Sequence, residues 1–245
     1  MAIKKKAAEK PNRSTTRRLY LWLKWSGVIV TGLLLIEFGY VLGLMPDWDQ
    51  FIHGPIQKSS IIQQYEYEQT LHDDWPPLQW HPVPLFMIPK HVLRAVVVAE
   101  DSRFYQHKGF DQQAIQDAIE YNLSKGRIVY GASTISQQTV KNFFLTTSRS
   151  PLRKLHEIIL TYAMEKNVGK QRILEIYLNI SEFGRGIYGV EAASRYYFGK
   201  SVSELSIDQA VELAATLPAP VNHNPYSRTP FFLRHKSKIQ QHLGL

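Results

Sequence analysis

Residues 89–111 read PKHVLRAVVVAEDSRFYQHKGFD, and this stretch sets the class of the fold. Val92, Val96 and Ala99 recur at the spacing of one helical face. The apolar run ends directly in two adjacent carboxylates, Glu100 and Asp101. The sequence therefore predicts a buried helix as the central element, with two acidic residues at its C-terminal end.

The sequence beyond this stretch continues the helical pattern. Asp111 is a candidate N-cap, either Ser133 or Thr134 is the cap of a short helix, and Pro151 suits the first turn of a long one. The expected helices begin at 89, 111 and 151 or cover 133–142, 170–179, 187–197, 206–216 and 230–243. No segment alternates convincingly as a strand, so we predict a mainly α class in one compact body.

Towards the amino terminus, residues 25–45 form a candidate membrane span. These 21 residues hold one charge, Glu37, and eleven of them are Leu, Ile, Val or Phe. Those eleven favour insertion by about 5 kcal/mol, against a cost of about 3 kcal/mol for one central charge. Glu37 either leans toward the nearer interface, which we favour, or contacts another membrane protein.

The basic residues gather in front of this span. Residues 1–24 contain eight of the 29 bases and one of the 21 acids, a net charge of +7, and the rest of the chain carries +1. Positive residues before a span keep the amino terminus in the cytoplasm, and no small-residue cleavage signal follows the span. A nucleic-acid-binding domain would carry its positive charge on the folded body, so we expect no nucleic acid partner.

Four parts follow from these observations. Residues 1–24 form a basic cytoplasmic tail, 25–45 a transmembrane signal anchor, 46–88 a juxtamembrane connector and 89–245 the exported helical domain. The connector is rich in proline and tryptophan, and prolines at this density interrupt regular structure. The chain has no cysteine, which removes thiol nucleophiles and cysteine metal sites.

The two carboxylates after the apolar helix are the first candidate site. The helix macrodipole disfavours an acid at this end, and apolar neighbours also raise the pKa of a carboxyl group toward the range of a general base. The structural alternative is that Asp101 or Glu100 pairs with Arg103 or His107 and closes the turn. The residues alone leave both interpretations open.

Residues 131–142, GASTISQQTVKN, are the second candidate site. Ser133, Gln137 and Lys141 are spaced at i, i+4 and i+8 and so share a helical face, which can hold sugar hydroxyls and one phosphate. The alternative is an ordinary polar helix with a cap, and without further help that interpretation is favoured.

The third candidate site is a group of bases, Arg149, Arg153 and Lys154, at the start of the helix from Pro151. Such groups beside a helix N-terminus suit a pyrophosphate. The alternative is a surface pair between Arg153 and Glu157, which contributes only about 0.3–0.5 kcal/mol.

One motif points elsewhere. Gly184, Gly186 and Gly189 match G-x-G-x-x-G, with Asp208 about 20 residues further on, as in dinucleotide-binding folds. The preceding residues have a helical pattern and no βαβ unit is present, so the sequence disfavours a dinucleotide site.

Taken in order, these segments resemble the peptidoglycan glycosyltransferase family. The resemblance covers residues 89–225 and rests on EDxxFxxHxG at 100–109, GxSTIxQQxxKN at 131–142, RKxxE at 153–157, KxxILxxYLN at 170–179, and GIYGVEAA followed by YFGK within 186–200. It implies a lysozyme-like helical domain with a small membrane-facing lobe, preceded by one N-terminal transmembrane helix. The chain is similar to the monofunctional members, because it ends without room for a transpeptidase domain.

The resemblance also implies the reaction and its residues. The enzyme would polymerise lipid II into glycan strands by inverting glycosyl transfer, releasing undecaprenyl pyrophosphate. Glu100 would act as general base, and Glu157 would be the second catalytic carboxylate. The expected substrate-binding residues are Asp101, Ser133, Gln137, Lys141, Asn142, Arg149, Arg153 and Lys154.

No cofactor is obligatory in this scheme, although Mg²⁺ or Mn²⁺ held by Glu157 is left open. The expected partners are lipid II, the lipid-linked strand, the membrane and other proteins of cell-wall synthesis. The expected location is a bacterial inner membrane, crossed once, with the catalytic domain in the periplasm.

Two alternative functions make different demands on these residues. A lysozyme-like glycan hydrolase or lytic transglycosylase uses a glutamate on a neutral glycosidic bond and needs no pyrophosphate site, so the bases near Pro151 argue against it. A non-catalytic anchored scaffold for the cell wall predicts that Glu100 and Glu157 are dispensable.

Overall fold

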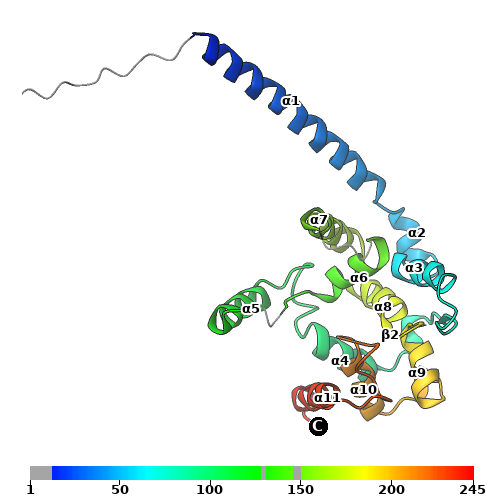
Figure 1. Ribbon diagram of the computed structural model, residues 1–245. Coiled ribbons are helices and arrows are strands. Elements are labelled where there is room, and N and C mark those ends of the chain that lie inside the picture. The colour runs from blue at the N-terminus through cyan, green and yellow to red at the C-terminus, as the bar shows by residue number, and fades with distance from the viewer. Residues whose placement is uncertain (1–12, 128–130, 146–149) are drawn as a thin grey trace, which may run out of the picture. The chain divides into compact units, whose positions relative to one another are not determined.

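The chain divides into two compact units, Met1–Pro46 and Asp47–Leu245. The computed structural model describes residues 13–127, 131–145 and 150–245. It is 65% helix and 3% strand, which confirms the mainly α class (Figure 1).

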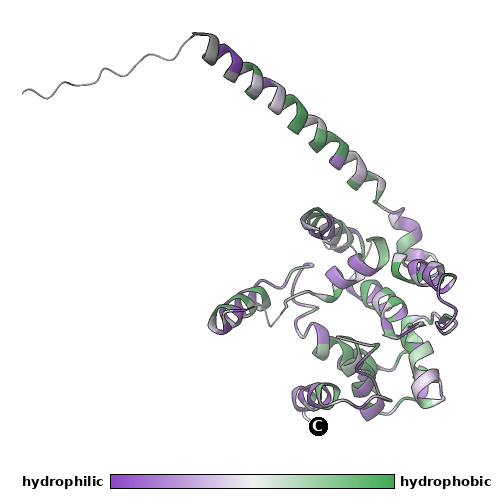
Figure 2. Ribbon diagram, viewed as in Figure 1, coloured by the Kyte–Doolittle hydropathy of each residue, from purple (hydrophilic) through white to green (hydrophobic). Residues whose placement is uncertain are grey.

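The described part of the first unit is one long helix, α1 (Arg13–Gly43). Its 31 residues correspond to about 46 Å of helix, more than the roughly 30 Å of a bilayer core. The stretch Tyr20–His53 is a candidate membrane span, because it contains an 18-residue window with a mean hydropathy of 2.1. Figure 2 shows the apolar residues gathered along α1. This helix is therefore long and apolar enough to cross a membrane, at the place where the sequence predicts a span.

The second unit holds the other described elements. They are α2 (Trp48–His53), α3 (Ser60–Gln69), β1 (Gln79–Trp80), η1 (Leu85–Met87), α4 (Lys90–Glu100), α5 (Gln112–Lys125), α6 (Ile135–Phe144), α7 (Pro151–Asn167), α8 (Lys170–Ile180), β2 (Glu182–Gly184), β3 (Ile187–Tyr188), α9 (Val190–Phe198), η2 (Val202–Glu204), α10 (Ile207–Thr216) and α11 (Pro230–Leu243).

The core forms where α4 packs on α10 and where α6 packs on α7 and α8. Val92 and Val96 of α4 are fully buried, as their spacing predicts. From α8, Ile173, Leu174 and Leu178 are also fully buried. Each such side chain contributes about 1.5–3 kcal/mol relative to an exposed position. The core thus holds the end of α4 and the length of α6 rigidly.

The helix starts follow the expected capping chemistry. The Asp111 side chain accepts from the backbone N–H of Ala114 at 3.0 Å and caps α5. Thr134, one of the two expected candidates, caps α6 and forms a capping box with Gln137. Pro151 opens α7, as predicted.

The expectation that no segment is a strand is wrong, and so is the expected helix start at 187. In the described residues β1, β3 and β2 form a small sheet, with β1 parallel and β2 antiparallel to β3. Strands of two or three residues are too short to show alternation. Ile187 belongs to β3, and Gly189, with φ of 85°, precedes Val190 at the true start of α9.

Residues 47–88, most of the expected connector, contain α2, α3, β1 and η1. They belong to the same compact unit as the helical body. The Trp80 indole N–H donates to the Asn179 carbonyl at 2.8 Å, and Ser60 Oγ donates to the Leu145 carbonyl at 2.8 Å. The proline-rich segment thus packs on α6 and α8, while a juxtamembrane position remains a prediction.

Helix α5 stands apart from the packed helices of its unit (Figure 1). Its exposed side chains include apolar ones, among them Ile119 at 53% and Leu123 at 75%. Only Ala118 is buried within the helix. This helix lies between the first and second motifs, and the resemblance implies a small lobe near the second motif.

Candidate active site

Glu100 is the last residue of α4 and is half-buried. The Gln138 side-chain amide on α6 donates to its carboxylate at 2.7 Å. Tyr177 on α8 donates its hydroxyl to the carbonyl oxygen of the same Gln138 at 3.3 Å. Three helices therefore meet to orient one carboxylate.

The pKa of Glu100 is raised, chiefly because burial disfavours the charged form. The hydrogen bond from Gln138 and the charge of Lys141 lower this pKa, and the charge of Asp101 raises it. A carboxyl group so placed is suited to accept a proton, because a general base works best with a pKa near the operating pH.

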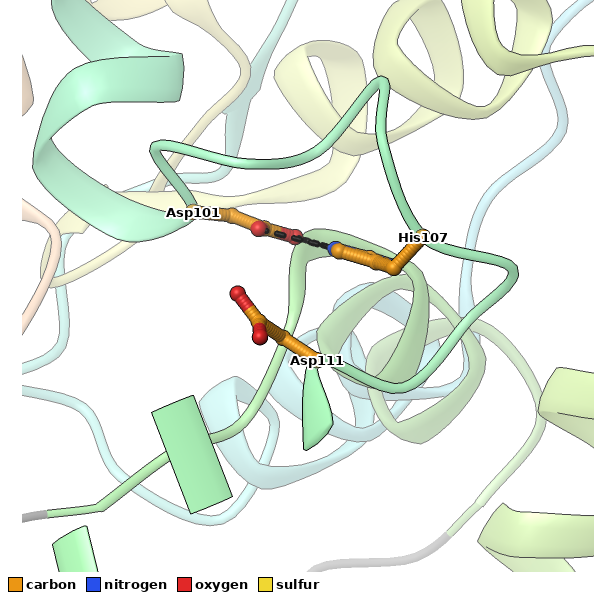
Figure 3. Close-up of side chains that lie close together, drawn as sticks. All are labelled: Asp101, His107 and Asp111. Carbon is orange, nitrogen blue, oxygen red and sulfur yellow. Dashed lines mark hydrogen bonds and ion pairs between the residues drawn. The ribbon is translucent and has the colours of Figure 1, made fainter. Parts of the chain in front are cut away.

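Asp101, by contrast, points into a structural network (Figure 3). Its buried carboxylate accepts from His107 Nε2 at 2.9 Å and from the backbone N–H of Ile135 at 3.0 Å. The Ile135 bond ties the first motif to the first turn of α6. The structural interpretation of the first motif therefore applies to Asp101, which closes the turn. Glu100 does not take part in the turn and accepts a hydrogen bond from Gln138 instead.

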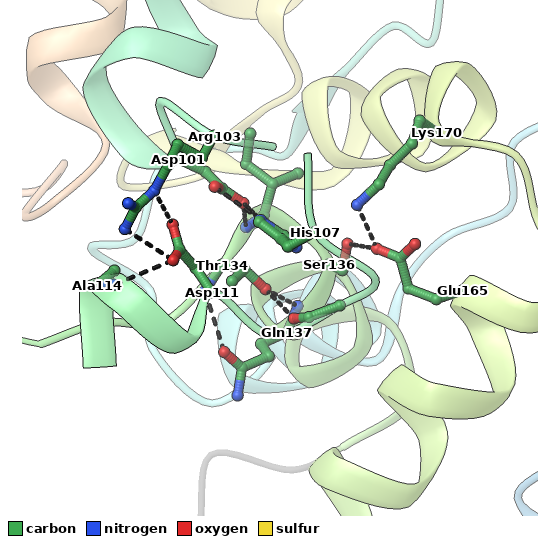
Figure 4. A network of polar contacts seen from close by, with 12 residues as sticks. Asp101, Arg103, His107, Asp111, Ala114, Thr134, Ser136, Gln137, Glu165 and Lys170 are labelled. Carbon is green, nitrogen blue, oxygen red and sulfur yellow. Dashed lines mark hydrogen bonds and ion pairs between the residues drawn. The ribbon is translucent and has the colours of Figure 1, made fainter. Parts of the chain in front are cut away.

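The surrounding contacts fix this loop on its neighbours (Figure 4). Arg103 donates two hydrogen bonds, each of 2.8 Å, to Asp111. Thr134 Oγ1 donates to the Gly109 carbonyl at 2.6 Å. Gly109 has a φ of 89°, and a Cβ there would lie 2.9 Å from Thr161 Cγ2, so only glycine fits.

Asp101, His107 and Asp111 lie close enough for a metal ion to bridge them. Their ligand atoms are already used, however. Arg103 neutralises Asp111, while His107 and a backbone N–H satisfy Asp101. These contacts fit a hydrogen-bonded turn better than a cation site.

The bases of the third motif surround Glu157. Its side chain is only 3% exposed, and one oxygen accepts from Arg153 Nη1 at 3.1 Å while the other accepts from Lys154 Nζ. The expected pair of Arg153 with Glu157 exists, but its carboxylate is buried rather than on the surface. Arg153 Nε is also buried and has no hydrogen-bond partner among the described residues.

Lys141 on α6 interacts electrostatically with both carboxylates, Glu100 and Glu157. Burial around its ammonium group lowers its pKa, although much of the side chain is exposed. The charges of Glu157 and Glu100 raise this pKa, and those of Arg153 and Lys154 lower it. Lys141 therefore links Glu100 electrostatically to the bases of the third motif.

A cleft of about 560 Å³ opens beside these groups, within the range of about 300–1,000 Å³ typical of small-ligand sites. The residues that line it include Gln138, Lys141, Asn142, Arg153 and Tyr177, and also Tyr65, Trp75, Glu182, Arg185 and Tyr188. Glu100 lies next to the cleft through its bond to Gln138.

Of the other expected site residues, Ser133 is exposed just before the cap of α6, and Gln137 is buried in that cap. Arg149 lies outside the described residues. Two residues of the site are not among those predicted from the sequence: Gln138, one position beyond Gln137, and Tyr177 of the fourth motif. The helical spacing of Ser133 and Lys141 predicts Gln137 as the residue on the same face. In the structure α6 packs on α8, and it is Gln138 that faces the cleft.

Known proteins of one family match most of this chain. The transglycosylase family matches residues 68–243. The chain is similar to proteins named biosynthetic peptidoglycan transglycosylase. One from Thiobacillus denitrificans is 47% identical over 228 residues, covering 93% of this chain and 97% of that protein. Another from Chromobacterium violaceum is 40% identical over 222 residues, covering 88% and 93% respectively.

The fold is a helical body that holds a carboxylate beside a cationic cleft. Together with these relatives, it identifies the chain as a glycosyltransferase. The chain belongs to the transglycosylase family and polymerises the glycan strands of peptidoglycan. The hydrolase and scaffold alternatives are not favoured.

Proposed function

We propose that the substrate is lipid II and that Glu100 starts the reaction as general base. The observation that carries this proposal is the half-buried Glu100, with its raised pKa, beside a cleft lined by Lys141 and Arg153. A sugar hydroxyl is a poor nucleophile and needs a base, and a departing pyrophosphate needs cations.

In the proposed reaction the 4-hydroxyl of the lipid II N-acetylglucosamine attacks the anomeric carbon of the lipid-linked strand. Its proton passes to Glu100. A new C–O bond forms on the face opposite the pyrophosphate, and the bond from the anomeric carbon to the pyrophosphate oxygen breaks. The electron pair of that bond leaves with undecaprenyl pyrophosphate. The configuration inverts because the attack comes from the face opposite the leaving group.

Lys141, Arg153 and Lys154 stabilise the negative charge that grows on the leaving group. The buried Nε of Arg153 supports this role, because a buried donor without a partner is costly and a phosphate oxygen would satisfy it. Glu157 holds two of these bases in place. It is therefore proposed to act by positioning them.

The scheme requires no resident cofactor, because the pyrophosphate is already an activated leaving group. A divalent cation bound to Glu157 does not fit the residues present, since each of its oxygens already contacts a positive side chain. The proposed reaction therefore has no step that uses a metal ion at this carboxylate.

The membrane placement is also proposed. Helix α1 would anchor the enzyme in a bacterial inner membrane, with the basic tail in the cytoplasm and the second unit in the periplasm. The exposed apolar residues of α5 would rest on the same membrane. Enzyme and lipid-linked substrate would then share one plane.

The test is polymerisation of labelled lipid II by the purified chain, with polymer length as the readout. Glu100→Gln keeps the shape and removes the basicity, so turnover should fall by about 10²–10⁴-fold while the fold persists. Asp73→Asn changes an exposed carboxylate outside the cleft and is the matched control. Near-normal polymerisation by folded Glu100→Gln would overturn the assignment, and glycan shortening by the wild type would indicate a hydrolase.

A further inference from the structure

The last turn of α6 carries Lys141 and Asn142, and both residues line the cleft. The final carbonyl groups of a helix have no partner within the helix, so its last turn frays unless other groups bind them. The position of the Lys141 ammonium group therefore depends on what holds this turn in place.

Ser60, the first residue of α3, binds the end of this turn. Its Oγ donates to the Leu145 carbonyl at 2.8 Å and lies 3.2 Å from the Asn142 carbonyl oxygen. The Leu145 N–H in turn donates to the Lys141 carbonyl at 3.3 Å. Ser60 is not among the described residues that line the cleft, so its link to the reaction runs through the backbone of α6.

Phe51 of α2 holds the same turn by its side chain. Its buried ring lies with its centroid 5.0 Å from that of Phe143 and 5.5 Å from that of Phe144. Both distances fall in the range of favourable aromatic pairs, about 4.5–7 Å. One ring of α2 thus packs against both aromatic side chains that end α6.

Arg172 of α8 fixes α2 in turn. Its guanidinium donates to the Phe51 carbonyl at 3.1 Å, to the Gly54 carbonyl at 2.5 Å and to Glu175 at 2.9 Å. A Cβ at position 54 would overlap the Gln50 carbonyl oxygen, so glycine is required where α2 ends. These bonds hold α2 to α8, the helix on which α6 also packs. We call Phe51, Ser60 and Arg172 the α6 clamp.

We propose that the α6 clamp positions Lys141 for catalysis, by holding the last turn of α6 so that the ammonium group stays at the departing pyrophosphate. This inference rests on the proposed function, which assigns Lys141 to the leaving group. The clamp residues are positioning residues, because none of them lines the cleft. Two of them lie between residues 48 and 60, the segment that follows α1 along the chain. Loss of the clamp would displace the cation without removing it.

The test uses the full chain and labelled lipid II. Ser60→Ala removes the hydroxyl group and leaves Lys141 in the protein, so kcat should fall about tenfold, because the cation is displaced rather than deleted. The KM should stay within about twofold, since the negative charge grows as the pyrophosphate leaves. Ser60→Thr keeps a hydroxyl group and should restore most of the rate. Ser237→Ala, at an exposed serine of α11, is the matched control and should keep the wild-type kcat.

A second comparison separates positioning from general stability. In a Lys141→Ala background, Ser60→Ala should change kcat by less than about twofold, because residues that act as a unit have non-additive effects. An equal loss of kcat in both backgrounds would overturn the clamp, and so would a kcat of Ser60→Ala within twofold of the wild type. A Ser60→Thr variant that recovers the melting temperature but not kcat would do the same. The proposed function is tested separately, because wild-type polymerisation and the Lys141→Ala variant report on it without any change at Ser60.

Discussion

At the scale of single residues, Glu100 is subject to opposing influences. Burial raises its pKa, while Gln138 and Lys141 lower it. A base must be deprotonated before it can accept a proton, so the polymerisation rate should fall as the pH drops through the pKa of Glu100. The neighbouring residues thus set the acid limb of the pH profile.

Replacing Gln138 tests this balance. Gln138→Leu removes the hydrogen bond that stabilises the charged form, so the pKa of Glu100 should rise further. The acid limb of kcat/KM should move to higher pH, and the loss of activity should grow as the pH falls. Gln241→Leu, an exposed change on α11, should leave the profile in place. If the acid limb of the kcat/KM profile of Gln138→Leu is unchanged or moves to lower pH, the result would contradict the role of Glu100.

The bases beside Glu157 allow a second test at this scale. Lys154→Ala should reduce turnover by about 10²-fold, because it removes one of the cations that stabilise the negative charge on the leaving group. The double exchange of Lys154→Glu with Glu157→Lys preserves the pair but moves the cation. It should not rescue activity, and it should place a lysine at a position that is only 3% exposed. Polymerisation rates and melting temperatures of single and double variants decide; full rescue would favour a purely structural pair.

At the scale of elements, the site depends on where α6 begins. Thr134 caps this helix and also donates to the Gly109 carbonyl in the loop after α4. Further along, Ser136 donates to Glu165 of α7, and Lys170 of α8 pairs with the same Glu165 at 2.7 Å. The cap and this ion pair therefore determine where Gln138 and Lys141 lie.

Thr134→Ala should lower the free energy of unfolding by about 1–2 kcal/mol, because it removes both the cap and the bond to Gly109. Activity should fall as well, since α6 carries Gln138. Ser133→Ala, one residue earlier and exposed, should change stability by less than about 0.5 kcal/mol. Chemical denaturation of the three proteins in detergent provides the comparison, and equal stabilities would rule out the cap as a determinant.

At the scale of the whole molecule, charge and hydropathy separate the two units. The tail of residues 1–24 carries +7, and the remainder of the chain is nearly neutral at +1. The apolar stretch of α1 follows directly. Such a distribution is typical of an anchor that holds its amino terminus in the cytoplasm.

A reporter fused after Leu245 should therefore be active only outside the cytoplasm. Removal of residues 1–46 should leave measurable polymerisation of lipid II in detergent, because the cleft lies within Asp47–Leu245. The rate on lipid II in vesicles should fall more, since the enzyme no longer shares the plane of its substrate. A fusion active in the cytoplasm would reverse the topology.

Local sequence patterns predict much of the secondary structure of this protein. Helix α11 spans Pro230–Leu243, the range that the sequence predicts, and Asp111 and Pro151 start helices as expected. Thr134, one of the two expected candidates, caps α6. Periodicity, caps and prolines act over a few residues, so a single sequence carries them. The apolar stretch of α1 and the position of Glu100 at a helix end also follow from local sequence.

Contacts between distant segments decided the rest. Packing of α6 on α8 brings Gln138, and not Gln137, to Glu100. Tyr65 and Trp75, from the expected connector, meet Arg185 across more than a hundred positions. The burial of Glu157 and the short sheet of β1, β3 and β2 depend on the same long-range packing. A pattern read along the chain specifies which face of a helix is apolar, but only the assembled core determines which polar side chain the neighbouring helix leaves facing the cleft.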